Sequence, residues 1–169
     1  MPNVKQILSG HNKIILRKNK PVEEKRSCNC RGGIQKCPVD GQCLKQEVIY
    51  EVEIAAEHLE SKLYIGSTAT SFKERYSNHK SDCKLEHRRH ATKLSGYVWS
   101  LKDIDKTSSI KYKFKEFAPA YNPVTDRCRL CLVEKLEILL ADENKYLNDR
   151  TELLAKCRHV NKFILGGIT

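Results

Sequence analysis

Apolar and charged residues alternate over residues 48–54, and this period of two predicts a strand with one buried face. Glu51 and Glu53 lie opposite the apolar set, which is Val48, Tyr50, Val52 and Ile54. A second short strand is expected over residues 63–66, and Gly66 should end it. The two strands are close enough in sequence to pair with each other.

Helical spacing follows these strands. Ser71 with Glu74 three residues later is a capping-box signal, so a helix is expected over residues 72–83. Residues 92–102 also have helical spacing, carried by Leu94, Tyr97, Val98 and Leu101. These residues and the neighbouring Trp99 are more typical of a core than of a base-stacking platform.

Residues 110–117 alternate again and predict a third strand. Its apolar side is Ile110, Tyr112 and Phe114, and its other side is a row of lysines, Lys111, Lys113 and Lys115. Such a row either follows a phosphate backbone or protects a sheet edge from pairing. With further helices over residues 129–141 and 151–156, the pattern predicts an α/β protein of the α+β type. A small, mainly antiparallel three-stranded sheet is flanked by helices.

Charge favours a polyanionic partner. The 169-residue chain has 31 Lys and Arg against 21 Asp and Glu, a net charge of +10, and nucleic acid is the first candidate for a partner. The basic loop at residues 85–93 is either a phosphate-contacting rim or a solvated loop. No apolar run reaches membrane-spanning length and no signal peptide opens the chain. We therefore expect a protein that binds nucleic acid and is neither secreted nor bound to a membrane.

The first part of the chain divides into two segments. Residues 1–27 are basic and are interpreted as a partly extended lead-in, either a solvated linker or an arm along a phosphate backbone. Residues 28–44 form a Cys-rich knuckle with turn-forming glycines, and its candidate Zn²⁺ ligands are Cys28, Cys30, Cys37 and Cys43. Disulfides or idle thiols are the alternatives. Residues 45–169 form the remaining domain.

A second ligand set lies far downstream. Cys128 and Cys131 have the CxxC spacing of metal ligands, and Cys157 with His159 can complete a second zinc site if the fold brings the pairs together. Alternatively, the downstream ligands pair with cysteines of the first set. The remaining cysteine, Cys83, ends a predicted helix and is interpreted as a small buried hydrophobe.

One acid in the helix of residues 129–141 has unusual neighbours. The expected apolar stripe is Leu132, Val133, Leu136, Leu139 and Leu140. Glu134 lies nearly opposite that stripe, yet Leu130 and Ile138 are one turn away. A carboxylate among apolar residues needs a partner such as a metal ion. A salt-bridged structural acid is the alternative, and Glu137 is interpreted as an ordinary surface acid.

These residues together resemble the GIY-YIG nuclease superfamily. The motif is carried by V-I-Y at residues 48–50 and Y-I-G at residues 64–66, with Val48 in place of the first glycine, a position that a strand residue can occupy. The residues that match the site of the family are Tyr50, Tyr64, Arg75, His79, Glu134 and Asn148, and Gly66 is assigned to the cofactor-binding part. Asn148 is alternatively the N-cap of the following helix.

The resemblance implies metal-dependent hydrolysis of phosphodiester bonds. Glu134 would hold Mg²⁺ or Mn²⁺, Arg75 would neutralise charge on the phosphate, and Tyr50 or Tyr64 would activate water with His79 beside them. A free tyrosine titrates near 10, so its pKa would have to be lowered for it to act as a base.

Within the superfamily, the chain is most similar to the endonuclease domain of Penelope-like retroelements. The likeness runs from about His11 onward and includes the C-R-L-C-L-V-E-K-L run and the L-N-x-R-x-E-L-x-x-x-C-R-H ending. It implies a nickase that cuts DNA to supply a primer end for insertion, in the nucleus or, before import, the cytoplasm. A reverse transcriptase domain or element RNA are further candidate partners. The alternatives are a zinc-stabilised DNA-binding module without cleavage and a host repair-type nuclease.

Overall fold

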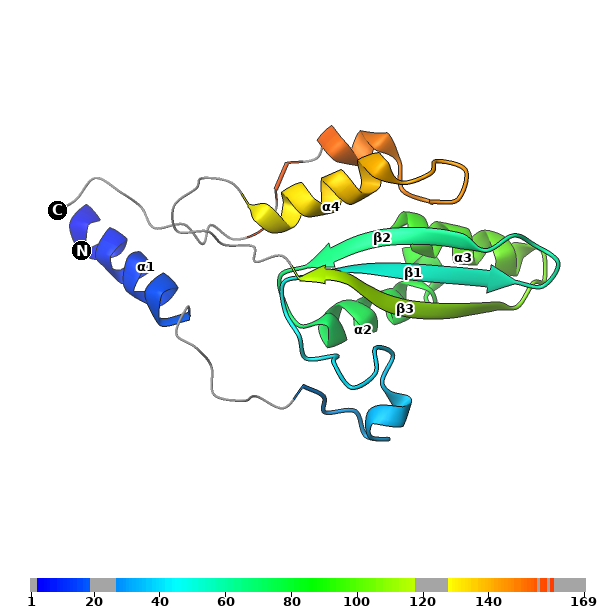
Figure 1. Cartoon of the computed structure of the whole chain (residues 1–169), viewed down its shortest axis with the longest axis horizontal. Helices are drawn as coiled ribbons and strands as arrows, with labels where there is room; N and C mark the ends of the chain where they lie inside the picture. Colours follow the sequence, from blue (N-terminus) through cyan, green and yellow to red (C-terminus); the bar gives the residue numbers. More distant parts are fainter. Residues whose placement is uncertain (1–2, 19–26, 118–127, 155, 158, 160–169) are drawn as a thin grey trace.

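A three-stranded antiparallel sheet forms the centre of the protein. The computed structural model describes residues 3–18, 27–117, 128–154, 156, 157 and 159. Strand β1 (Val48–Ala56) lies between β2 (Lys62–Thr68) and β3 (Ser108–Phe117), in the order β2-β1-β3 (Figure 1). The α+β class and the antiparallel sheet predicted from the alternation are thus confirmed. The second strand, however, does not end at Gly66, because it pairs with β1 as far as Thr68.

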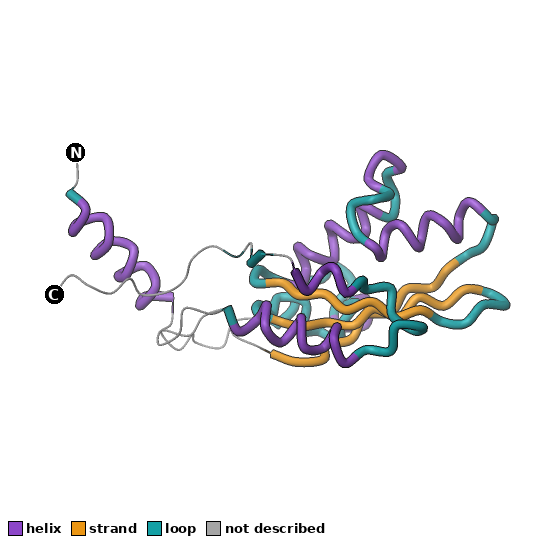
Figure 2. The backbone as a smooth tube through the Cα atoms, turned by 90° about the horizontal axis from the view of Figure 1, so that it is seen from above, coloured by secondary structure: helices purple, strands orange, loops and turns teal. Residues whose placement is uncertain are grey.

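Helices cover both faces of this sheet (Figure 2). On one face α2 (Phe72–Asp82) and α3 (Lys93–Asp103) pack on the even-numbered side chains of β1, in a core that includes Tyr50, Phe72 and Leu94. On the other face α4 (Arg129–Leu140) packs on Ile49 and Ile65. Short 3₁₀ helices, η1 (Ile34–Lys36), η2 (Glu86–Arg88) and η3 (Arg150–Leu154), complete the described elements.

Side chains cap the starts of two helices. The predicted capping residue Ser71 accepts a hydrogen bond from the backbone of Glu74 at the start of α2. Thr92, whose capping role was not predicted, forms a capping box with Ser95 at the start of α3. Two further N–H groups of the first turn of α2 are satisfied from the segment before β1, because the carbonyls of Cys43 and Lys45 accept from Lys73 and Phe72. The Cys-rich segment is thereby attached to α2.

The N-terminal segment differs from the expectation of a partly extended lead-in. Residues Val4–Lys18 form α1, a helix that Figure 1 shows apart from the sheet. Its start is capped by Asn3, whose side chain accepts from the backbone of Gln6 at 2.9 Å while the Gln6 side chain accepts from the backbone of Asn3 at 3.0 Å. The expectation of a partly extended lead-in was therefore wrong for residues 4–18. Residues 19–26 lie outside the described part.

Helix α4 is turned differently from the prediction. Its buried residues are Leu130 and Ile138, the two on the side of Glu134. Most of the predicted stripe faces away from the core: the exposed members are Leu132, Leu136, Leu139 and Leu140. The predicted apolar stripe is therefore not the buried face of α4. The helix packs on the sheet through a narrow face, so the side with the most leucines need not be the buried side. Glu137 is not a free surface acid either, since its carboxylate lies 2.6 Å from the ammonium of Lys115.

A short segment after α4 extends the sheet beyond β2. The backbone of Leu63 donates to the carbonyl of Lys145 at 2.9 Å and accepts from the backbone of Leu147 at 2.7 Å, which gives a parallel bridge between Leu63 and Tyr146. This segment brings Asn148 to the free edge of β2. No helix in the described ranges is long and apolar enough to cross a membrane.

Candidate active site and metal centres

The phenol of Tyr50 is the centre of a buried polar group. Its oxygen lies 2.8 Å from Nε2 of His79 and accepts a hydrogen bond from Nε of Arg75 at 2.9 Å. Arg75 and His79 lie one turn apart on α2, as the sequence predicted, and β1 supplies the tyrosine. Three of the predicted site residues are therefore in direct contact.

Gly66 provides the space that this arrangement needs. A Cβ atom at this position would lie 2.4 Å from the Tyr50 hydroxyl oxygen and 2.6 Å from Cζ of the same ring. No real Cβ makes such contacts, so only glycine lets the ring of Tyr50 lie across β2. The glycine thus has a packing role that the sequence did not reveal, and its assignment to a cofactor stays a prediction.

The Tyr50–His79 pair is neutral at rest. Burial raises the pKa of Tyr50 to about 12 against an opposing effect of Arg75, and burial together with the Arg75 charge lowers the pKa of His79 to about 3. Nδ1 of His79 is a buried atom without a hydrogen-bond partner among the described residues.

Tyr64 lies beside this group on β2. Its ring meets the ring of His79 edge-on, with centroids 6.1 Å apart. Burial raises its pKa, as it raises that of Tyr50, whereas the expected role as a base requires a lowered pKa. It keeps 7% of its surface exposed, whereas Tyr50 has none. Of the two tyrosines, only Tyr64 therefore has access to solvent.

Glu134 faces the same end of β2 from α4. Burial raises the pKa of its carboxyl, opposed by hydrogen bonds from the side chain and backbone of Ser67 and by the charge of Arg75. The charge of Glu134 in turn raises the pKa of both tyrosines, and the charge of Arg75 lowers it. The carboxylate is thus within electrostatic reach of the Tyr50 group. It has the partners of a structural acid, and its role as a metal ligand stays a prediction.

The side-chain amide of Asn148 pairs with the backbone of β2, as a neighbouring strand would. Its Oδ1 accepts from the backbone of Ile65 at 2.7 Å, and its Nδ2 donates to the carbonyl of Ile65 at 2.9 Å. The alternative N-cap role belongs to the next residue, because the carboxylate of Asp149 accepts from the backbone of Thr151 at 2.9 Å. The structure therefore places Asn148 beside the Y-I-G residues.

Glu152 and Ser67 are two polar neighbours that the sequence analysis did not select. Glu152 accepts from Nδ2 of Asn148 at 3.2 Å and from the backbone of Asp149 at 3.1 Å. The spacing D-x-x-E at residues 149–152 is a capping signal that could have indicated it. The contact of Ser67 with Glu134 has no comparable sequence signal, since it depends on β2 continuing past Gly66.

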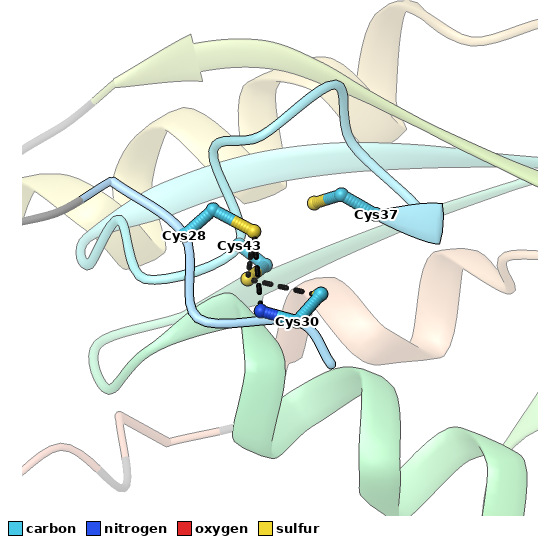
Figure 3. A group of neighbouring side chains, drawn as sticks. All are labelled: Cys28, Cys30, Cys37 and Cys43. Carbon is cyan, nitrogen blue, oxygen red and sulfur yellow. Dashed lines mark hydrogen bonds between the residues drawn. The ribbon is translucent and has the colours of Figure 1, made fainter. Parts of the chain in front are cut away.

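The first cysteine set forms one four-thiol group. The sulfurs of Cys28, Cys30, Cys37 and Cys43 all lie within 4.8 Å of one another, and Figure 3 shows them converging. Sγ of Cys43 is 3.6 Å from that of Cys28 and 3.7 Å from that of Cys30. These separations are close to the edge of about 3.8 Å of a tetrahedron with Zn–S bonds of about 2.3 Å, and too long for a disulfide of about 2.05 Å.

Electrostatics favour an ion in this group. Burial raises the pKa of Cys30 to about 12, whereas Cys37, despite the opposite effect of burial, has its pKa lowered to about 7 by the backbone N–H groups of Val39, Gly41 and Cys43. Backbone donors aimed at one sulfur stabilise a thiolate, which is the form that ligates a metal. The residues present therefore fit a structural ion.

The second set forms a separate group. Cys128, Cys131, Cys157 and His159 have their ligand atoms within 4.8 Å of one another. Nδ1 of His159 lies 3.4 Å from Sγ of Cys128 and 3.2 Å from that of Cys131, near the roughly 3.5 Å expected for tetrahedral Zn²⁺. The structure thus separates the two ligand sets, and the alternative of a mixed site is wrong. Cys83 belongs to neither and packs half-buried against the core, as predicted.

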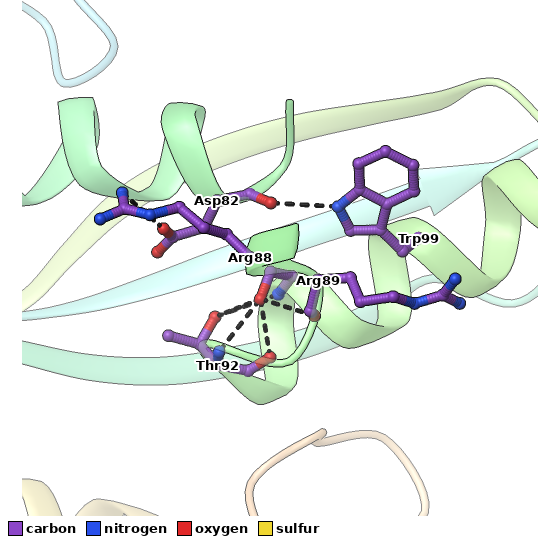
Figure 4. Close-up of polar contacts among 6 residues, drawn as sticks. Asp82, Arg88, Arg89, Thr92 and Trp99 are labelled. Atoms are coloured by element: carbon purple, nitrogen blue, oxygen red, sulfur yellow. Dashed lines mark hydrogen bonds and ion pairs between the residues drawn. The ribbon is translucent and has the colours of Figure 1, made fainter. Parts of the chain in front are cut away.

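Two arginines of the basic loop of residues 85–93 pair with acids of the protein itself, whereas His87 and His90 are exposed. Figure 4 shows Arg88 against Asp82. Arg88 pairs with Asp82 at 3.2 Å and Arg89 with Asp103 at 2.5 Å. Trp99 donates from Nε1 to the carbonyl of Asp82 at 3.0 Å, so its indole fixes the same turn. The structure gives these side chains packing partners, and phosphate contact by this loop stays a prediction.

The lysine row lies on the α4 face of the sheet at the outer strand β3. Lys111 and Lys113 are exposed, whereas Lys115 reaches Glu137 on α4 and Glu51 on β1. One of the three lysines therefore joins the sheet to a helix.

Comparison of the chain with protein-family models, with curated proteins and with solved structures finds no match.

Proposed function

We propose that the protein is a metal-dependent DNA endonuclease of the GIY-YIG type, most similar to those of Penelope-like retroelements. The observation that carries this proposal is the contact of the Tyr50 oxygen with both Arg75 and His79, above a glycine whose hydrogen alone fits beneath the ring. Burial of a phenol, a guanidinium and an imidazole in one group costs stability, and such groups cluster at functional sites. The order of these residues along the chain matches the resemblance.

In this proposal Glu134 holds Mg²⁺ or Mn²⁺, which would polarise the scissile phosphate when bound. Arg75 supplies a planar cation for the developing negative charge. Tyr64, which keeps some exposed surface, is the tyrosine in reach of an attacking water, and Tyr50 orients Arg75 and His79. The two Cys groups hold structural Zn²⁺, and the product is a nicked strand that primes insertion of a retroelement in the nucleus.

Nicking of supercoiled plasmid in Mg²⁺ or Mn²⁺ tests the proposal. We expect open circles from the wild type and at least about a 100-fold lower rate from Glu134→Gln, which keeps the shape of the side chain and removes its charge. Glu137→Gln is the matched control, because it changes an acid one turn away that pairs with Lys115. Tyr64→Phe and Tyr50→Phe, assayed separately, distinguish the base from the orienting residue.

A protein that binds the plasmid but does not nick it in either metal would overturn the nuclease proposal. The net charge of +10 and the two Cys groups would then support the second candidate, a zinc-stabilised DNA-binding module. Equal loss of nicking in Glu134→Gln and Glu137→Gln would refute the specific role of Glu134.

A further inference from the structure

Glu152 makes contacts that a helix cap alone does not require. One carboxylate oxygen accepts from the backbone of Asp149 at 3.1 Å, which caps η3. The other accepts from Nδ2 of Asn148 at 3.2 Å. Its charge also raises the pKa of Tyr64 and of Glu134, which places the carboxylate near both.

The contact with Asn148 fixes the orientation of an amide. The Asn148 amide has two N–H hydrogens, one for the carbonyl of Ile65 at 2.9 Å and one for Glu152. If the amide were rotated by half a turn, its oxygen would face both the Ile65 carbonyl and the carboxylate, and both contacts would become repulsive. Glu152 therefore favours the one orientation in which Oδ1 accepts from the backbone of Ile65.

Ile65 is the residue between Tyr64 and Gly66, so its position sets both of them. Tyr64 lies against His79, and Gly66 lies beneath the ring of Tyr50. We propose that Glu152 is a positioning residue of the candidate site, which acts through Asn148 to hold β2 at Ile65. As a statement about cleavage, this inference rests on the proposed nuclease activity.

A set of four variants separates this role from capping. Asp149→Ala removes the cap to Thr151 and leaves the contact between Asn148 and Glu152. Glu152→Ala removes that contact together with the hydrogen bond from the backbone of Asp149 and leaves the cap to Thr151. We expect Glu152→Ala to lower kcat for nicking about 10- to 100-fold, with DNA binding unchanged and with Asp149→Ala close to the wild type. Because Glu152 acts through Asn148, the double variant Asn148→Ala/Glu152→Ala should be no slower than Asn148→Ala.

Exchange of the Ile65 amide hydrogen, measured by NMR on the metal-loaded chain, gives a second result that does not need cleavage. We expect faster exchange in Glu152→Ala and an unchanged rate in Asp149→Ala. If the wild type does not nick DNA, the proposed function fails and this exchange alone decides the inference. The inference is overturned if the Ile65 amide exchanges at the same rate in the wild type and in Glu152→Ala. It is also overturned if Glu152→Ala and Asp149→Ala lose nicking equally, or if the losses of Asn148→Ala and Glu152→Ala add in the double variant.

Discussion

Gly66→Ala should be among the most damaging small substitutions in the chain. The added Cβ would lie 2.4 Å from the Tyr50 oxygen and 3.0 Å from Cε2 of the ring. The ring cannot swing away freely, because Phe72 and His79 lie against it with centroids 5.2 and 5.8 Å distant. Overpacking costs about 1–3 kcal/mol, and breaking the contacts of the phenol adds about 1–2 kcal/mol for unsatisfied partners. We therefore expect a loss of about 2–5 kcal/mol.

Urea unfolding followed by the fluorescence of Trp99, the single tryptophan, measures this loss. Gly96→Ala is the control, because its Cβ would meet only the carbonyl of Arg89 at 3.7 Å and alanine favours a helix by about 1 kcal/mol. The decisive comparison is a double-mutant cycle with Tyr50→Leu, which shortens the side chain. In that background Gly66→Ala should cost less than about 1 kcal/mol. An equal cost in both backgrounds would refute the steric explanation.

Two further predictions concern His79 and the Cys groups. Because folding lowers the pKa of His79 from 6.5 to about 3, its neutral form contributes stability that is present above pH 6.5 and lost as the pH falls toward 3; between pH 6.5 and 5 the loss is about 2 kcal/mol. Urea unfolding of the metal-loaded proteins at several pH values should show that His79→Asn lacks this pH-dependent loss of stability. If the free energies of unfolding of the wild type and the variant fall equally with pH, the reasoning is contradicted. Native mass spectrometry should find two Zn²⁺ ions per chain and one in either Cys30→Ser or Cys131→Ser; two ions in both variants would exclude these sulfurs as ligands.

Local signals in the sequence predicted most of the sheet and its helices. Alternation over residues 48–54 and 110–117 identified β1 and β3, Ser71 identified the start of α2, and apolar spacing identified α3. Helix α1 was not predicted, because a basic segment with few apolar residues is equally typical of a solvated linker. The Asn3–Gln6 capping box is the local signal that marks its start. Its apolar residues bury little surface, since Val4 and Ile7 are exposed, so the helix depends on local interactions.

The parts of the site that the sequence could not predict depend on long-range packing. Leucines on more than one side of α4 allow the helix to pack on the sheet in two orientations. In the structure the side with Leu130 and Ile138 packs on the sheet, and this orientation directs Glu134 toward Ser67. The order of Tyr50, Arg75 and His79 was readable, but the need for Gly66 follows only from the path of one ring across β2. The partition of ligands between the two Cys groups likewise required the chain to be folded.

Zinc in the two four-ligand groups, as proposed, would couple the folding equilibrium to an ion concentration. A site that exists only in the folded chain adds about 1.4 kcal/mol to stability for each tenfold rise of free ion above its dissociation constant, so two sites add about 2.7 kcal/mol. The ratio of folded to unfolded protein then follows the second power of free ion. Without a zinc buffer, a measured free energy of unfolding would depend on the free zinc concentration as well as on the chain. A cell would likewise set the amount of folded protein through its free zinc.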